Sequence, residues 1–288
     1  MFDIIIIGAG PAGLSAAITA RARNKDVLVI SNDPQESALA KASHIDNYPG
    51  MPQISGSSLL EHMLKHAQAL GASFDFRKTI SILSMGNYFS VGVGDDIFEA
   101  RTIILATGAQ IAKPFKGEAE YLGRGVSYCA TCDGMLYRNT SVCVVGLSKD
   151  AVEEANFLSE IGCKVIFIAK QQTQGLSDSI ISMIGAVKEI KGDSLGVTDL
   201  MLKPVGADQV ETVSCNGVFI LRSSVAPNAL ITGLELNEGY IMVDADMKTT
   251  VPGVFAAGDC VGKPLQISKA TGEGQKACFS AVAYLDTQ

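Results

Sequence analysis

Two cysteines near the middle of the 288-residue chain are the residues best suited to chemistry. Cys129 and Cys132 are separated by two residues, and Asp133 follows them directly. This spacing lets the two sulfurs close a small disulfide ring in which each perturbs the acidity of the other, so the pair can accept and release two electrons. Asp133 is a candidate general acid that protonates a released thiolate. Half of a zinc site or two buried thiols would show the same spacing and remain alternatives.

The N-terminus predicts a nucleotide-binding turn. Residues 3–7 form an apolar run typical of a strand buried on both faces of a parallel sheet, and a helix is expected over 11–23. Between them, the first glycine permits a tight turn, the second lets the backbone approach a pyrophosphate, and the third lets the helix pack on the strand. The candidate contacts in this turn are Gly8, Gly10, Pro11, Ala12 and Gly13. A glycine turn without a ligand is the alternative.

Two further strand ends supply candidate cofactor contacts. A strand expected over 27–30 ends about twenty residues after the last glycine, where a ribose-binding group is expected, and Asp33 stands near it. A buried strand expected over 102–105 runs into small residues that would allow a cofactor to lie close. The candidates at these two ends are Ser31, Asn32, Thr107 and Gly108.

The C-terminal segment predicts a second contact to the same ligand. An apolar strand over 254–257 closes on Gly258 and Asp259, and the carboxyl ends of parallel strands are where open α/β sheets bind ligands. The Asp259 carboxylate could accept hydrogen bonds from sugar hydroxyls. If the next helix begins near Gln266, its free amides can stabilise negative charge on a reduced isoalloxazine ring.

A second strand, turn and helix begin at residue 142, but of the glycine pattern this turn keeps only Gly146. Ser148 stands where a second glycine would let a pyrophosphate approach, and Leu147 adds bulk to the same turn. A helix is expected over 151–161. After a strand expected over 165–168, residues 169–172 contain no arginine to hold a 2′-phosphate. The nucleotide-binding fold is therefore expected to persist without a working nicotinamide site, and NADPH binding through other contacts is the alternative.

The remaining segments carry weaker predictions. A helix is expected over 57–70, where His62 and His66 lie one turn apart, but without an acidic residue between them or a third ligand we expect no metal. Residues 217–220 are expected to return the chain to the first domain. Separate β-rich stretches are expected over 74–82, 88–93 and 97–99, ahead of the strand at 102–105. Core packing is expected for the other thiols, which are Cys143, Cys163, Cys215, Cys260 and Cys278.

Composition narrows the possible partners and the compartment. The formal net charge is −7 and no cluster of Lys and Arg appears, which argues against a nucleic-acid partner. No run of about 18 apolar residues predicts a membrane span, and the N-terminus does not resemble a signal peptide. The seven cysteines are an odd and mostly scattered set, which fits a reducing compartment. We therefore expect a cytoplasmic protein.

Five segments together resemble the low-molecular-weight thioredoxin reductases across essentially the whole chain. They are GAGPAG from Gly8, NYPG from Asn47, ATGA from Ala106, GRGVSYCATCDG from Gly123 and GVFAAGDC from Gly253. The resemblance implies an α/β fold of two Rossmann-like dinucleotide-binding domains, the second inserted into the first. It implies a discontinuous FAD-binding domain at 1–111 and 223–288, and an inserted CxxC-bearing domain with a degenerate NAD(P)-type fold at 112–222.

The resemblance also implies roles for individual residues. In that family FAD occupies the first glycine turn and the GD segment, and the enzyme is a homodimer. Cys132 would face the flavin, Cys129 would attack thioredoxin, and Asp133 would donate a proton. The FAD contacts implied by position are Gly8, Gly10, Gly13, Asn47, Gly258, Asp259, Gln266 and Ile267.

The departures from the family pattern concern the electron donor. Members that use NADPH carry GGGxxA, an HRR-like arginine group and a GGQ-type stretch after the second strand. This chain has GLSKDA from Gly146 and IAKQQ from Ile168. With GDCVGKP at Gly258 and KATGEGQ at Lys269, it resembles the ferredoxin-dependent flavin thioredoxin reductases, which use no pyridine nucleotide.

This resemblance implies ferredoxin as the donor and thioredoxin as the acceptor. Two other functions stay open at this point. One is an NADPH-dependent reductase of thioredoxin or of a small peroxiredoxin-like partner. The other is a flavin-binding redox sensor that does not turn over.

Overall fold

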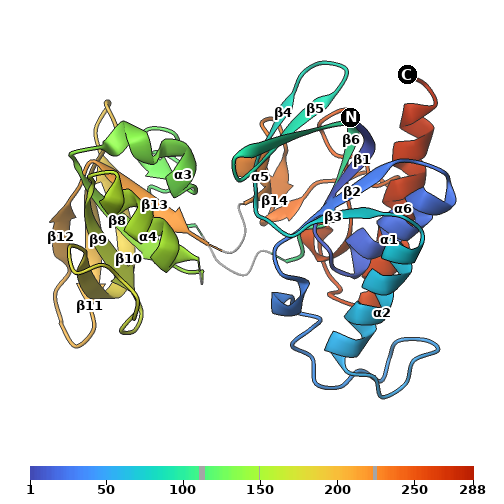
Figure 1. The fold of residues 1–288 in the computed structure, drawn as a ribbon, viewed down its shortest axis with the longest axis horizontal. Helices are drawn as coiled ribbons and strands as arrows, with labels where there is room; N and C mark the ends of the chain where they lie inside the picture. Colours follow the sequence, from blue (N-terminus) through green and yellow to red (C-terminus); the bar gives the residue numbers. More distant parts are fainter. Residues whose placement is uncertain (110–113, 149, 223–225) are drawn as a thin grey trace. The chain divides into compact units, whose positions relative to one another are not determined.

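The structure is a computed structural model that describes residues 1–109, 114–148, 150–222 and 226–288 (Figure 1). The chain divides into two compact units, one made of Met1–Ile111 and Ser224–Gln288 and the other of Ala112–Ser223. Each unit is built on its own seven-stranded sheet. Within the described residues, no helix is both long and apolar enough to cross a membrane.

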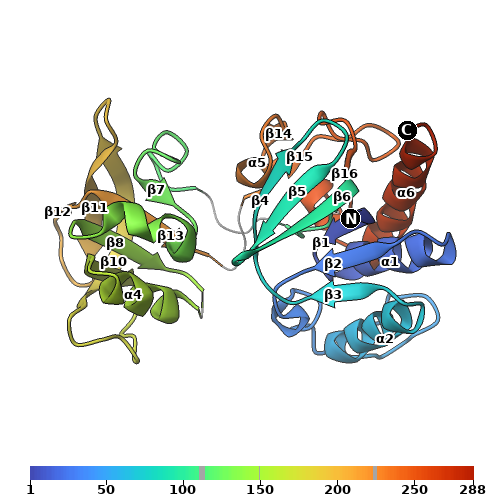
Figure 2. The same cartoon turned by 45° about the horizontal axis from the view of Figure 1, so that its top comes forward.

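The sheet of the first unit has the order β3-β2-β1-β6-β5-β4, with β16 also paired to β6 (Figure 2). The strands β3, β2, β1, β6 and β16 are mutually parallel neighbours, so their carboxyl ends lie along one edge. The strands are β1 Phe2–Ile7, β2 Val27–Ile30, β3 Ser73–Asp75, β4 Thr79–Ser84, β5 Phe89–Val93, β6 Asp96–Leu105 and β16 Val254–Ala256. A short separate hairpin pairs β14 Leu236–Asn237 with β15 Tyr240–Ile241.

Three helices of the first unit gather beside this sheet (Figure 1). They are α1 Pro11–Ala22, α2 Gly56–Ala69 and α6 Ile267–Leu285. α1 and α6 approach closely because both carry small residues: a Cβ on Gly274 would overlap the carbonyl group of Ala12. The short helical turns of this unit are η1 Pro34–Glu36, α5 Pro227–Leu230 and η3 Gly258–Val261.

The sheet of the second unit has the order β12-β11-β10-β9-β8-β13-β7. Its strands are β7 Val126–Ser127, β8 Ser141–Gly146, β9 Lys164–Ala169, β10 Ile181–Gly192, β11 Val197–Pro204, β12 Glu211–Ser214 and β13 Gly217–Leu221. Its helical segments are α3 Ala130–Asp133, η2 Gly134–Tyr137 and α4 Ala151–Glu160. Apolar clusters include residues from both faces of the parallel strands β8, β9 and β13, which accounts for their continuous apolar sequences.

Two expectations about the strands were wrong. Residues 97–99 and 102–105 belong to one strand, β6, because Arg101 stays in the ladder while its side chain reaches the Leu285 carbonyl oxygen at 3.3 Å. Residues 217–220 do not return to the first unit. They form β13, which is fully buried between β7 and β8, and Val218 pairs with both of those strands.

Candidate active site

The first glycine turn joins β1 to α1, and its three glycines have different surroundings. Gly8 has a φ of +115°, and a Cβ there would overlap the carbonyl oxygen of Ala106. A Cβ on Gly13 would overlap the carbonyl oxygen of Gly8. A Cβ on Gly10 would meet nothing within 4 Å. Gly8 and Gly13 are thus required by the fold, whereas Gly10 borders open space in which a ligand can approach the backbone.

The start of α1 is free to receive a negatively charged group. Gly10 is its N-cap and offers no side chain to the first amides, Pro11 occupies the first turn, and that turn contains no acidic residue. The first N–H groups of a helix have no partner within the helix, and the helix dipole favours negative charge there. Gly8 to Gly13 therefore form a site suited to phosphate.

The turn η3 packs directly on this site. Gly258 has a φ of +85°, and a Cβ there would lie 2.7 Å from the Cβ of Ala12. The Oδ1 atom of Asp259 is buried and has no hydrogen-bond partner among the described residues. Burial raises the pKa of Asp259, and Glu273 adds to this while Lys269 opposes it. A ligand that brings hydroxyl groups to this oxygen would satisfy it, as the ribityl or ribose part of a dinucleotide does.

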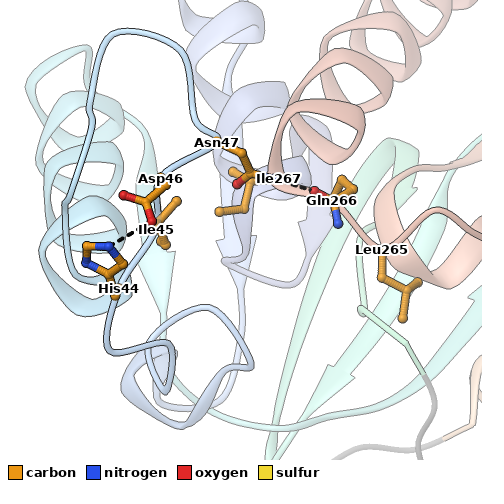
Figure 3. A pocket seen from close by; sticks show the side chains of 7 residues that line it. All are labelled: His44, Ile45, Asp46, Asn47, Leu265, Gln266 and Ile267. Carbon is orange, nitrogen blue, oxygen red and sulfur yellow. Dashed lines mark hydrogen bonds and ion pairs between the residues drawn. The ribbon is translucent and has the colours of Figure 1, made fainter.

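A pocket of about 390 Å³ lies at the start of α6 (Figure 3). It is lined by His44, Ile45, Asp46, Asn47, Leu265, Gln266 and Ile267. The side-chain amide of Asn47 donates a hydrogen bond to Oε1 of Gln266 at 2.8 Å, and Gln266 is the N-cap of α6. The structure thus brings together three predicted residues, Asn47, Gln266 and Ile267, from segments about 220 positions apart.

His44 and Asp46 are members of this pocket that the sequence analysis missed. Nε2 of His44 lies 2.8 Å from Oδ2 of Asp46, and both side chains are more than half exposed. Their only sequence signal was their position within three residues of Asn47. Neither residue belongs to the motif that identified that asparagine.

The other predicted contacts lie at the ends of neighbouring strands. Ser31 follows β2, and its N–H donates to the carbonyl oxygen of Asp75 at 3.0 Å. Gly108 follows β6 with a φ of +75°, and a Cβ there would meet nothing within 4 Å. Asn32 and Thr107 stand beside these two residues in the chain. Because β2, β1, β6 and β16 are parallel neighbours, these residues share one sheet edge with Gly8 and Gly258.

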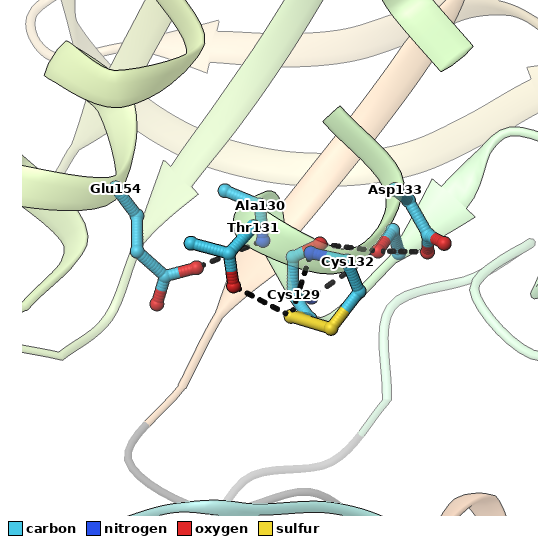
Figure 4. Close-up of a disulfide and its surroundings, with 7 residues drawn as sticks. Cys129, Ala130, Thr131, Cys132, Asp133 and Glu154 are labelled. Carbon is cyan, nitrogen blue, oxygen red and sulfur yellow. Dashed lines mark hydrogen bonds between the residues drawn. A yellow bond between two sulfur atoms is a disulfide. The ribbon is translucent and has the colours of Figure 1, made fainter. Parts of the chain in front are cut away.

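In the second unit Cys129 and Cys132 form a disulfide, with a Cα–Cα distance of 5.4 Å (Figure 4). Cys129 is buried, at 6% exposure, whereas Cys132 is exposed. The sulfur of Cys129 accepts a hydrogen bond from the Cys132 N–H at 3.1 Å and lies 3.3 Å from the Thr131 hydroxyl. Hydrogen bonds to a sulfur favour its thiolate form, so the surroundings of Cys129 are suited to a nucleophile.

Asp133 is held near the disulfide by a residue that sequence reasoning did not single out. The hydroxyl of Ser127 lies 2.7 Å from Oδ2 of Asp133, and it also accepts the N–H of Cys129 at 3.1 Å. Ser127 is buried on β7, at 4% exposure. The sequence carried no signal for Ser127, because β7 consists only of Val126–Ser127 and the burial of the hydroxyl is seen only in the structure.

Two more side chains fix the segment that carries the disulfide. Oε2 of Glu154, in the first turn of α4, accepts the N–H of Ala130 at 2.9 Å. Tyr128 donates its hydroxyl to Oε1 of the buried Glu118 at 2.9 Å, and Glu118 is paired with Arg222. Burial first, and then the Glu118 carboxylate, raise the pKa of Tyr128. Residues on both sides of Cys129 are therefore anchored to the body of the second unit.

The second glycine turn differs from the first. A Cβ on Gly146 would overlap the ring of Phe167, and Leu147 is 38% exposed. The Oγ atom of Ser148 is buried without a hydrogen-bond partner among the described residues. Lys149, which belongs to the same turn, lies outside the described residues. The counterpart of Gly10 in this turn is Ser148, so a side chain stands where the first turn has only backbone.

Comparison with known proteins places the chain in a family. The model of the pyridine nucleotide-disulphide oxidoreductase family matches residues 2–274. A thioredoxin reductase from Listeria innocua is 35% identical over 301 aligned positions, covering 99% of this chain and 94% of that protein. A ferredoxin-flavin thioredoxin reductase from Clostridium acetobutylicum superimposes with a TM-score of 0.86 at 41% identity, covering 99% and 98% of the two chains. A thioredoxin reductase from Gloeobacter violaceus superimposes with a TM-score of 0.82 at 34% identity, covering 99% and 95%.

These similarities confirm the expected α/β fold and the resemblance to thioredoxin reductases. They also imply FAD, and the unfilled space beside Gly10 and the unpaired oxygen of Asp259 fit a dinucleotide with sugar hydroxyls. The chain therefore belongs to the pyridine nucleotide-disulphide oxidoreductase family, as an FAD-dependent relative of the thioredoxin reductases.

Proposed function

We propose that the protein is a thioredoxin reductase that takes electrons from reduced ferredoxin and passes them through the Cys129–Cys132 disulfide to thioredoxin. The observation that carries this proposal is the contrast between the two glycine turns in a chain that holds a closed CxxC disulfide. The first turn has open space at Gly10, whereas the second carries the side chains of Leu147 and Ser148 at the positions of Ala9 and Gly10.

The FAD contacts in this proposal lie in the first unit. The turn Gly8 to Gly13, with open space at Gly10, would hold the pyrophosphate. Asp259, whose Oδ1 lacks a partner among the described residues, would accept hydrogen bonds from sugar hydroxyls, and the hydrogen-bonded pair Asn47 and Gln266 would hold the flavin end. Further contacts come from Pro11, Ala12, Ser31, Asn32, Thr107, Gly108, Gly258 and Ile267. When bound, FAD converts single electrons into the two-electron chemistry that a disulfide requires.

The two cysteines have different roles in the proposed reaction. Reduction of the ring takes two electrons and two protons and gives two thiols. The Cys129 sulfur, as a thiolate, then attacks the thioredoxin disulfide, which forms a mixed disulfide and releases one thioredoxin sulfur. Asp133 supplies the proton for the released thiolate, and attack by Cys132 on Cys129 closes the ring again and frees reduced thioredoxin.

The hydrogen bonds around the ring support this assignment. Cys129 receives the Cys132 N–H and contacts the Thr131 hydroxyl, which favours a thiolate on Cys129. Cys132 is the exposed sulfur of the closed ring and is assigned to face the flavin. Because Cys129 is buried while the ring is closed, the ring must open before this sulfur can reach a protein partner.

Exposed apolar side chains next to the disulfide support a protein partner. Met135 is 58% exposed and Leu136 is 79% exposed, and both follow Asp133 in η2. Large apolar side chains at such exposure are typical of interaction surfaces when they border a reactive group. We assign them to contact with thioredoxin. We also propose that the enzyme is a homodimer, which light scattering of the purified protein tests.

The degraded second turn supports ferredoxin rather than NADPH as the donor. The 41% identity with the Clostridium acetobutylicum ferredoxin-flavin enzyme supports the same choice. A ferredoxin near −400 mV lies about 130 mV below thioredoxin at about −270 mV, a two-electron driving force of roughly 6 kcal/mol. Reduction of thioredoxin by such a donor is strongly downhill.

Stopped-flow mixing of the FAD-loaded protein with each donor tests the proposal. We expect reduced ferredoxin to bleach the flavin absorbance and to support thioredoxin reduction, and NADPH at micromolar concentration to do neither. Fast bleaching by NADPH would assign the protein to the NADPH-dependent reductases. A second assay supplies electrons from dithionite, and failure to reduce thioredoxin there would favour a redox sensor without turnover.

A further inference from the structure

A lysine on α6 joins both ends of the turn that carries Asp259. Nζ of Lys269 lies 3.0 Å from the carbonyl oxygen of Gly258 and 2.6 Å from that of Gly262. The same ammonium lies 3.0 Å from Oε2 of Glu273, one helical turn further on. This carboxylate oxygen also accepts the N–H of Gly258 at 2.9 Å. Lys269 and Glu273 together satisfy backbone groups at both ends of η3.

The charges of this cluster are poorly solvated. The side chains of Lys269 and Glu273 are 18% and 21% exposed. Asp259 adds a second carboxylate, and its Oδ1 is buried without a partner among the described residues. Burial raises the pKa of Asp259, Glu273 raises it further, and Lys269 lowers it. Burial likewise raises the pKa of the adjacent Cys260 thiol to about 11, so this thiol is neutral near pH 7.

The cluster stands where a dinucleotide would add more negative charge. η3 packs on the first turn of α1, where a Cβ on Gly258 would lie 2.7 Å from the Cβ of Ala12, and residues 11–14 of that turn include no charged side chain. The charged groups that face the turn are therefore Lys269 and Glu273 from α6 and Asp259 from η3. Without the lysine, two carboxylates would face each other beside a pyrophosphate that carries about two negative charges.

We propose that Lys269 is a positioning and charge-compensating residue for FAD, which holds the Gly258–Asp259 turn in place and offsets the negative charge of Asp259 and Glu273. The inference rests on the placement of FAD at the first glycine turn. It does not depend on the identity of the electron donor or of the protein substrate. Lys269 acts through the turn and need not touch the cofactor.

FAD titration of the apoprotein, followed by quenching of flavin fluorescence, tests this inference without turnover. We expect Lys269→Met to weaken FAD binding by about 30-fold at pH 8, since removing one partner of a poorly solvated charge pair costs about 2 kcal/mol or more. The loss should shrink as the pH falls to 5.5. Without the ammonium, the pKa of Asp259 is no longer lowered by Lys269, so its protonation at low pH removes repulsion.

A second substitution separates charge compensation from a purely structural role, in which Lys269 only holds the Gly258–Asp259 turn in place. Glu273→Gln keeps an oxygen for the Gly258 N–H and removes one negative charge. We expect it to bind FAD as well as the unchanged protein or more tightly, and the double variant Lys269→Met, Glu273→Gln to recover most of the affinity at pH 8. A purely structural role predicts instead that the double variant binds FAD as weakly as Lys269→Met, and that this loss does not change with pH.

A control variant separates failure of this inference from failure of the FAD placement. Gly10→Val fills the space beside the first turn and is expected to abolish FAD binding. If Gly10→Val binds FAD normally, the cofactor lies elsewhere and the proposed site is wrong. If Gly10→Val loses FAD while Lys269→Met binds it as well as the unchanged protein at both pH values, the site stands and the role of Lys269 is refuted.

Discussion

The two glycine turns occupy equivalent places in their sheets, after a buried parallel strand and before a helix, yet they offer a ligand opposite surroundings. Gly8 and Gly146 correspond, and a Cβ on either would overlap its surroundings. A Cβ on Gly10 would meet open space, whereas the counterpart of Gly10 in the second turn is Ser148. The second turn also carries the exposed side chain of Leu147 and the buried hydroxyl of Ser148. A shared strand and helix therefore do not imply a shared ligand.

The starts of the two helices differ in charge as well as in space. The first turn of α1 has no acidic residue, whereas the first turn of α4 has Glu153 and Glu154. A carboxylate at this position occupies the favourable field that a phosphate would otherwise use. Glu154 directs its carboxylate to the N–H of Ala130, so α4 supports the disulfide segment. The second unit therefore has the same strand, turn and helix, but the start of its helix stabilises the segment that carries the two cysteines.

The largest effect is expected from the cysteines, because they give the second unit its chemistry. Cys132→Ser should lower ferredoxin-driven thioredoxin reduction by at least about 10³-fold, since the ring can no longer close. The remaining Cys129 should form a stable mixed disulfide with thioredoxin, which mass spectrometry detects. The FAD content should stay unchanged because the cysteines lie outside the first unit.

The matched control for this change is Cys163→Ser. Its sulfur is buried and donates to the Tyr137 carbonyl oxygen at 3.3 Å, a bond that a hydroxyl can also make. Turnover should therefore persist. Comparable losses in Cys132→Ser and Cys163→Ser would show that the CxxC pair has no special role.

The next largest effect is expected when valine is introduced into the first turn, and the same residue in the second turn serves for comparison. Gly10→Val should weaken FAD binding by at least about 100-fold, about 2.7 kcal/mol, because it fills the space left for the pyrophosphate. Gly10 has a φ of −82°, which valine adopts without strain, so folding should be preserved. Leu147→Val in the second turn should leave FAD binding unchanged. Equal losses in both variants, measured by FAD titration, would contradict the contrast between the turns.

The sequence predicted the elements that depend on local signals. The apolar run of β1, the glycines after it and the small residues of α1 lie within about twenty positions, so one segment specifies strand, turn and helix. The same holds for β8 and α4. The division of residues 97–105 into two strands was wrong, because β5 pairs with β6 up to Ala100 and β1 pairs with it from Ala100 to Leu105, so one strand continues through Arg101.

The parts of the site that depend on tertiary packing were not predictable in this way. Ser127 meets Asp133, Glu154 meets Ala130, and Lys269 meets Gly258. In each pair, one partner is a side chain of a type that is common at protein surfaces. The other partner is a group that a different element holds in place. No spacing rule marks such pairs, and the pocket members His44 and Asp46 were missed for the same reason.

A smaller effect is expected where α4 supports the disulfide segment. Glu154→Ala removes the acceptor for the Ala130 N–H, and a hydrogen bond to a charged group contributes about 1.5–3 kcal/mol. Hydrogen exchange in residues 129–133 should therefore become at least about tenfold faster, as followed by mass spectrometry. Glu153→Ala is the control, because Glu153 is exposed in the same helical turn. If both variants exchange alike, Glu154 does not stabilise the segment.

The smallest effect is expected when glycines are restored to the second turn. Leu147→Gly combined with Ser148→Gly should change NADPH-driven flavin reduction by less than about tenfold, or 1.4 kcal/mol. The turn would gain room, but Phe167 would still lie behind Gly146, the two glutamates would still face the helix start, and residues 169–172 would still lack an arginine. Stopped-flow measurement with NADPH checks this. A gain of several hundredfold would mean that two side chains alone closed the nicotinamide site, and that the rest of the second unit had remained competent for NADPH.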